Sequence, residues 1–93
     1  MSRYLLRAEC GELSGKKVLD VGCRTGENTQ MMSTMGADCY GIDPDQDAIR
    51  FALAEGLIDN EKAIACTLQD LPKDMVGSFD IATVWLFNVA YLI

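Results

Sequence analysis

Residues 17–28, KVLDVGCRTGEN, read as a buried strand, a glycine turn and the start of a helix. Gly22 and Gly26 flank the turn, and a residue without a Cβ adopts positive φ and lets a ligand approach the main chain. The helix that follows points its unpaired N–H groups and positive dipole end toward the turn. Together these parts form a small-molecule cradle at the carboxyl end of a parallel strand.

The glycines alone fit an ordinary strand-to-helix connection as well as they fit a binding site. Two acidic residues favour the binding site. Asp20 lies inside an apolar strand, where a carboxylate is costly to bury without partners. Asp43 ends the next apolar run, about twenty residues further on, the offset at which an acidic residue holds a nucleotide ribose.

These two segments, VLDVGCRTGENT and YGIDPDQDAI, resemble the class I S-adenosylmethionine-dependent methyltransferases, and LQDLP and GSFDIATV continue the likeness. It extends over about residues 13–90 and corresponds to the first part of a complete family domain. The resemblance implies a Rossmann-like three-layer αβα fold in one domain, residues 1–93, with an open parallel sheet of about four strands in the order 3-2-1-4. The implied cofactor is S-adenosylmethionine.

Carried onto this chain, the family pattern assigns Asp20 to the turn and to the amino group of the ligand. Asp43 would accept both ribose hydroxyls, and residues after the third strand would frame the adenine. The full set of implied cofactor-binding residues is Asp20, Gly22, Cys23, Arg24, Gly26, Asp43, Pro44, Thr67, Leu68, Asp70 and Trp85.

Three positions depart from the family pattern. Arg24 replaces a glycine, so that a positive φ there would cost on the order of 1 kcal/mol or more. Its charge would disfavour the sulfonium of the ligand but suit the ligand carboxylate. Thr67 stands where the family often has an adenine-contacting Asp, for which Asp70 is a displaced substitute. Trp85 stands near the end of the fourth strand, where many family members carry Asn or Asp, and packing is the favoured interpretation.

Hydrophobic periodicity and turn residues predict the elements between these motifs. Helices are expected over residues 3–13, 27–35 and 46–55, and strands over 18–21, 39–42, 63–68 and 79–87. Cys23 is expected to pack beneath the turn. The carboxylates near Asp43 fit helix capping better than a metal site, and the cysteines lack metal-ligand spacing.

A net charge of −6 without histidine argues against a nucleic-acid surface. No apolar run of about twenty residues is present to span a membrane, and no secretory signal is recognised, so a cytoplasmic location is expected.

The acceptor-binding part of the family domain has no counterpart here, so the chain alone is expected to be inactive. A fourth strand at the sheet edge would associate with a second copy through Trp85, Phe87 and Tyr91. Three other interpretations stay open: a non-catalytic interaction module on an inherited fold, part of a longer enzyme, and half of a dinucleotide oxidoreductase. The last is disfavoured because Arg24 interrupts the glycine pattern.

Overall fold

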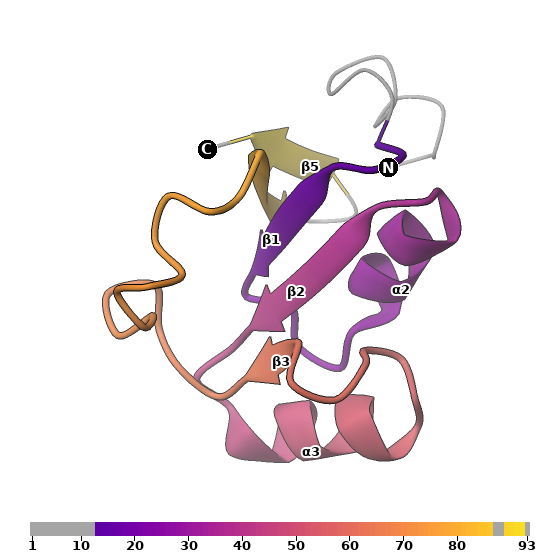
Figure 1. The fold of residues 1–93 in the computed structure, drawn as a ribbon. Helices are drawn as coiled ribbons and strands as arrows, with labels where there is room; N and C mark the ends of the chain where they lie inside the picture. Colours follow the sequence, from indigo (N-terminus) through magenta and orange to yellow (C-terminus); the bar gives the residue numbers. More distant parts are fainter. Residues whose placement is uncertain (1–12, 87–88, 93) are drawn as a thin grey trace.

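The computed structural model describes residues 13–86 and 89–92, which form a five-stranded sheet and two helices (Figure 1). The strand order is β3-β2-β1-β4-β5, in which the first four strands are parallel and β5 runs antiparallel to β4. The strands are β1 (Lys17–Val21), β2 (Asp38–Ile42), β3 (Ala63–Ile64), β4 (Ile81–Leu86) and β5 (Val89–Leu92). The expected Rossmann-like fold and its 3-2-1-4 order are confirmed.

Both helices belong to connections between parallel strands. The helix α2 (Glu27–Thr34) links β1 to β2, and α3 (Gln46–Ala54) links β2 to β3. Right-handed crossovers in the same direction along the sheet place both helices on one face. The predicted helix over 3–13 falls almost wholly outside the described residues.

The helical face of the sheet is held by two apolar clusters. The first joins β1, β2 and α2 through Val18, Cys39 and Met32, with Leu13 buried beside them. The second lies under α3 and comprises Cys23, Ile49, Ala52 and Ile58. Side chains alternate along a strand, so every second residue of β1, β2 and β4 contributes to this face.

The opposite face is covered by an irregular connection and not by a helix within the described residues. Leu71 from the segment 65–80 packs against Leu19 and Ile42, and Phe79 joins the same cluster. Figure 1 shows this segment in orange on the side of the sheet away from α2.

Two predictions about the strands were wrong, one about the length of β3 and one about the place of β4 in the sheet. The third strand ends at Ile64 and not at residue 68. Asp43 N still donates to Ile64 O, but Asp45 N donates to Asp43 Oδ1 and not to the chain after Ile64, so the pairing stops there. The chain then turns away, with Cys66 N donating to Ile64 O at 3.0 Å. Strand β4 is not the sheet edge, because β5 pairs with it from Thr83↔Leu92 to Leu86↔Val89.

The prediction that two copies associate through Trp85, Phe87 and Tyr91 therefore loses its premise of an unpaired fourth strand. Phe87 lies outside the described residues. Association between copies stays a prediction.

The turn between β1 and α2 has the backbone conformation that its sequence suggested. Gly22 and Gly26 have φ of 71° and 95°, and Arg24 between them has φ of 52°. The Ile42 carbonyl accepts from Gly22 N at 2.8 Å and from Cys23 N at 3.0 Å, which fixes the turn to the end of β2. Arg24 therefore has the positive φ whose cost the sequence analysis considered.

The backbone strain at Arg24 can be measured through its effect on the free energy of unfolding. Because glycine adopts positive φ without a Cβ clash, we expect Arg24→Gly to raise the free energy of unfolding by about 1 kcal/mol. Arg24→Ala removes the same side chain but keeps the Cβ, so it should not stabilise the fold. Urea unfolding of both variants checks this, and equal stability of the two would contradict it.

Gly41 in β2 marks the closest approach of the turn to the sheet. A Cβ at this position would lie 2.8 Å from Cys23 Sγ and 2.9 Å from Ile58 Cδ1. We expect Gly41→Ala to lower the free energy of unfolding by about 1–3 kcal/mol through overpacking. Cys23→Ala removes the nearest atom and should recover part of that loss in the double variant, whereas additive losses in urea unfolding would exclude the contact as the cause.

Candidate functional site

The carboxyl ends of β1 and β2 bring Asp43 and the glycine turn together. Val21 and Ile42 are paired in the parallel register, so the segments that follow them begin side by side. Asp43 Oδ2 accepts from Arg24 N at 2.9 Å, and Oδ1 accepts from Asp45 N at 2.9 Å. Asp43 is only 8% exposed, and its carboxylate ties the two connections into one unit.

Asp20 occupies the foot of the same turn, but it is enclosed. Its side chain has no exposed surface, and Oδ2 accepts from Thr29 Oγ1 in α2 at 2.7 Å. Oδ1 accepts from Thr83 Oγ1 in β4 at 3.3 Å. The carboxylate thus joins β1, α2 and β4, and it holds the turn in place from below. Contact of Asp20 with a ligand amino group stays a prediction.

Burial determines the charge state of Asp20. Desolvation raises its pKa to about 6, and the hydrogen bonds from Thr29 and Thr83 oppose that rise. The folded chain therefore holds this proton more tightly than the unfolded chain, in which the pKa is near 3.8. The contribution of Asp20 to the free energy of unfolding consequently falls as the pH rises from about 4 to about 6.

The turn is open on the side of Gly22, which we call its upper side, and packed on the side of Gly26. A Cβ on Gly22 would meet no atom within 4 Å, whereas one on Gly26 would lie 2.9 Å from Ile58 Cγ1. Gly26 is also the N-cap of α2, and no side chain caps the helix there. Backbone donors at the start of α2 therefore lie beside a turn whose upper side is accessible.

Cys23 packs beneath the turn, as predicted. It is 7% exposed and belongs to the cluster under α3. Desolvation, followed by the nearby charges of Asp20 and Asp43, raises the pKa of its thiol to about 12. The thiol therefore stays protonated and acts as a small apolar group.

The residues expected after the third strand form a turn of their own. Asp43 N donates to Ile64 O at 3.2 Å, so β3 ends at the same edge of the sheet. Further along, Asp70 Oδ2 accepts from Thr67 Oγ1 at 3.0 Å, and Leu68 between them is 46% exposed. Pro44 is exposed directly after Asp43.

Trp85 lies in the apolar cluster of α2. It packs against the cluster that contains Val18 and Met32, and its indole Nε1 is buried without a hydrogen-bond partner among the described residues. The packing interpretation is confirmed for this residue.

Thr29 and Thr83 were not singled out by the sequence, although both are fully buried. Thr83 carries the same signal as Asp20, a polar residue inside an apolar strand. Thr29 gives a weaker signal, because a threonine in the first turn of a helix is ordinary on its own.

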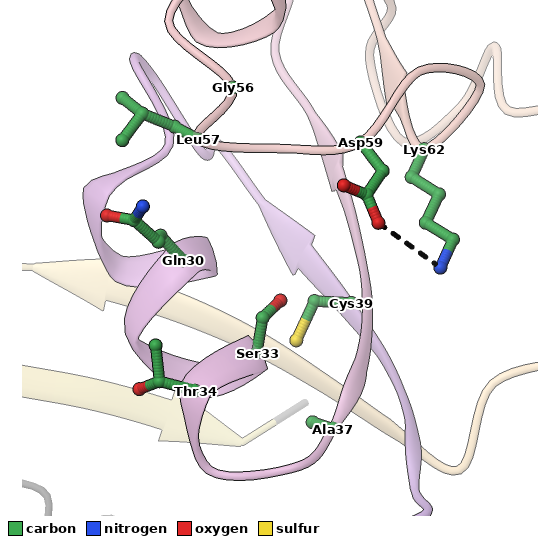
Figure 2. Close-up of a pocket in the computed structure, with 9 residues that line it drawn as sticks. All are labelled: Gln30, Ser33, Thr34, Ala37, Cys39, Gly56, Leu57, Asp59 and Lys62. Atoms are coloured by element: carbon green, nitrogen blue, oxygen red, sulfur yellow. Dashed lines mark ion pairs between the residues drawn. The ribbon is translucent and has the colours of Figure 1, made fainter.

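A separate polar groove of about 360 Å³ lies away from the turn. Figure 2 shows Ser33 of α2 and Cys39 of β2 on one side, with Asp59 and Lys62 of the α3–β3 connection on the other. Lys62 Nζ is paired with Asp38 Oδ1 at 2.8 Å and with Asp59 Oδ2 at 3.9 Å. The groove shares no lining residue with the turn, and its one cation is already paired.

Residues 13–86 and 89–92 contain no group of three or more histidine, cysteine, aspartate or glutamate side chains placed to hold a metal ion. None of the helices described there has the length and hydropathy that a membrane span requires.

Comparison with known proteins identifies the family. Ubiquinone biosynthesis O-methyltransferase of Bordetella avium is 36% identical over 75 residues, covering 78% of this chain and 31% of that protein. The protein of the same name from Paraburkholderia phymatum is 40% identical over 75 residues, covering 76% and 32%. The mitochondrial protein of Bos taurus is 40% identical over 73 residues, covering 73% and 20%.

The chain therefore spans about a third or less of the length of these relatives. The family described as "Methyltransferase domain" matches residues 1–87, which is nearly the whole chain. Together with the sheet order and the turn at its carboxyl edge, this match shows that the chain belongs to the methyltransferase domain family.

Proposed function

We propose that this chain carries the S-adenosylmethionine-binding part of a methyltransferase. The observation that carries the proposal is the turn between β1 and α2, which is open above Gly22 and fixed to Asp43 through Arg24 N. Membership of the methyltransferase domain family supports a methyl donor as the ligand.

The groups at the turn fit the chemistry of this cofactor. Each oxygen of Asp43 accepts one backbone N–H and has lone-pair capacity left for a ribose hydroxyl. Backbone donors at the start of α2 and the exposed Arg24 side chain suit the carboxylate of the methionine part. The turn from Thr67 to Asp70, with the exposed Leu68, would frame the adenine.

When bound, S-adenosylmethionine supplies a methyl group on a positively charged sulfur for in-line transfer to a nucleophile. The contribution of the chain is to bind and orient the cofactor, because positioning accounts for much of the catalysis in such a displacement. The relatives are named O-methyltransferases, so we propose an oxygen atom as the acceptor. A cytoplasmic location stays a prediction.

Calorimetric titration with S-adenosylmethionine and S-adenosylhomocysteine tests the proposal. We expect the wild-type chain to bind with a dissociation constant in the micromolar range, corresponding to about 8 kcal/mol at 1 μM. Asp43→Ala removes the acceptor for the ribose hydroxyls and should weaken binding by about tenfold or more.

Asp45→Ala provides a matched control. The Asp45 side chain caps α3 by accepting from Asp47 N and Ala48 N. Its loss should lower the free energy of unfolding by about 1 kcal/mol and leave the affinity unchanged. Absent or millimolar binding by the wild-type chain would favour a non-catalytic module, and equal affinity of Asp43→Ala and wild type would place the ligand elsewhere.

A further inference from the structure

Three polar side chains without exposed surface meet at the foot of the turn, each from a different element. They are Asp20 of β1, Thr29 of α2 and Thr83 of β4. An ionised carboxylate only accepts hydrogen bonds, which matches the two hydroxyl groups that donate to it at 2.7 and 3.3 Å. The arrangement is therefore complementary to the charged form of Asp20.

Protonation of Asp20 requires the hydrogen bonds around its carboxyl group to rearrange. The neutral carboxyl group carries an O–H donor, so one of the two threonine hydroxyls has to accept and direct its own hydrogen elsewhere. For a threonine in the first turn of a helix, the nearest alternative acceptors are backbone carbonyls three or four residues earlier. For Thr29 these are the carbonyls of Gly26 and Thr25, which belong to the turn itself.

We propose that Thr29 and Thr83 are positioning residues of the cofactor site, which hold Asp20 ionised and thereby make cofactor affinity depend on one proton. This inference rests on the proposed function, and it adds that protonation regulates the same site. Because Asp20 has no exposed surface in the free chain, its proton acts on the site through the shape and electrostatic field of the turn.

The two thiols near Asp20 do not titrate near neutral pH. The titratable groups that face Asp20 are the thiols of Cys23 in the turn and Cys39 in β2. Burial raises their pKa values to about 12 and about 11, so both stay neutral. Desolvation dominates the raised pKa of Asp20, and no charged group among the described residues contributes to it.

The direction of the effect follows from charge. S-adenosylmethionine carries a sulfonium and an ammonium group against one carboxylate, so an ionised Asp20 below the turn attracts it. With a pKa of about 6, roughly a tenth of Asp20 is ionised at pH 5. We therefore expect the wild-type chain to bind S-adenosylmethionine about tenfold more weakly at pH 5 than at pH 7.

The test is a calorimetric pH profile of this affinity between pH 4.5 and 7, where the ligand ammonium group stays protonated. Thr29→Val removes a hydrogen bond that stabilises the ionised form, so the midpoint of the profile should move upward by about one pH unit. Thr29→Ser keeps the hydroxyl and should keep the wild-type midpoint. Asp20→Asn should abolish the step near pH 6.

Thr83→Val provides a second variant if Thr29→Val fails to fold, and it should also move the midpoint upward. A purely structural role would weaken binding equally at all pH values and leave the midpoint in place. A flat wild-type profile, or equal midpoints for Thr29→Val and Thr29→Ser, would overturn the inference alone. Absence of binding at every pH would overturn the proposed function and the inference with it.

The pH dependence of unfolding without ligand reports the protonation of Asp20 independently of binding. In urea unfolding without ligand, the stability of the wild type relative to Asp20→Asn should fall between about pH 4 and pH 6, because the difference isolates the contribution of Asp20. Thr29→Val should extend the fall to higher pH, and Thr29→Ser should not. Identical profiles for wild type and Asp20→Asn would contradict a titrating Asp20.

Discussion

The carboxylate of Asp20 links the sheet to the turn. A lone charge in an apolar strand is strongly unfavourable, and here two threonine hydroxyls from separate elements offset part of that cost. Because Thr29 belongs to α2 and Thr83 to β4, the same contacts orient the helix and the neighbouring strand around β1. The turn starts two residues beyond Asp20, so its position follows from that of the carboxylate.

Asp43 plays the complementary part at the end of the neighbouring strand. Asp20 holds the turn from inside, whereas Asp43 holds it from the edge by accepting the backbone N–H of Arg24. That contact also helps to explain how a non-glycine residue is kept at a φ of 52°. The two acids therefore differ in exposure: Asp20 has no exposed surface, whereas Asp43 is 8% exposed, and we propose that the ligand binds at Asp43.

The sequence predicted most of what local patterns control. Helix α2 was expected over 27–35 and α3 over 46–55, and both were found within one residue of these bounds at either end. The buried place of Cys23 also followed from the glycine turn. These features depend on residues close together in the chain, where periodicity and turn chemistry are informative.

Features set by distant partners were missed. β3 ends at Ile64 because its neighbour β2 has stopped pairing, which the apolar run 63–68 does not reveal. The pairing of β5 with β4 and the meeting of Thr29 with Thr83 at Asp20 likewise join residues brought together only by the fold. A single polar residue in an apolar strand indicates that partners exist, but it does not say which ones.

The central claim is that the ligand lies over the turn between β1 and α2, next to Asp43. Backbone amide chemical shifts measured by NMR during titration with S-adenosylhomocysteine test it most directly. We predict that the largest chemical-shift changes fall on the amides of Gly22, Arg24 and Gly26 and on those after Asp43. Changes centred instead on Ser33, Cys39 and Lys62, which line the separate groove, would contradict it.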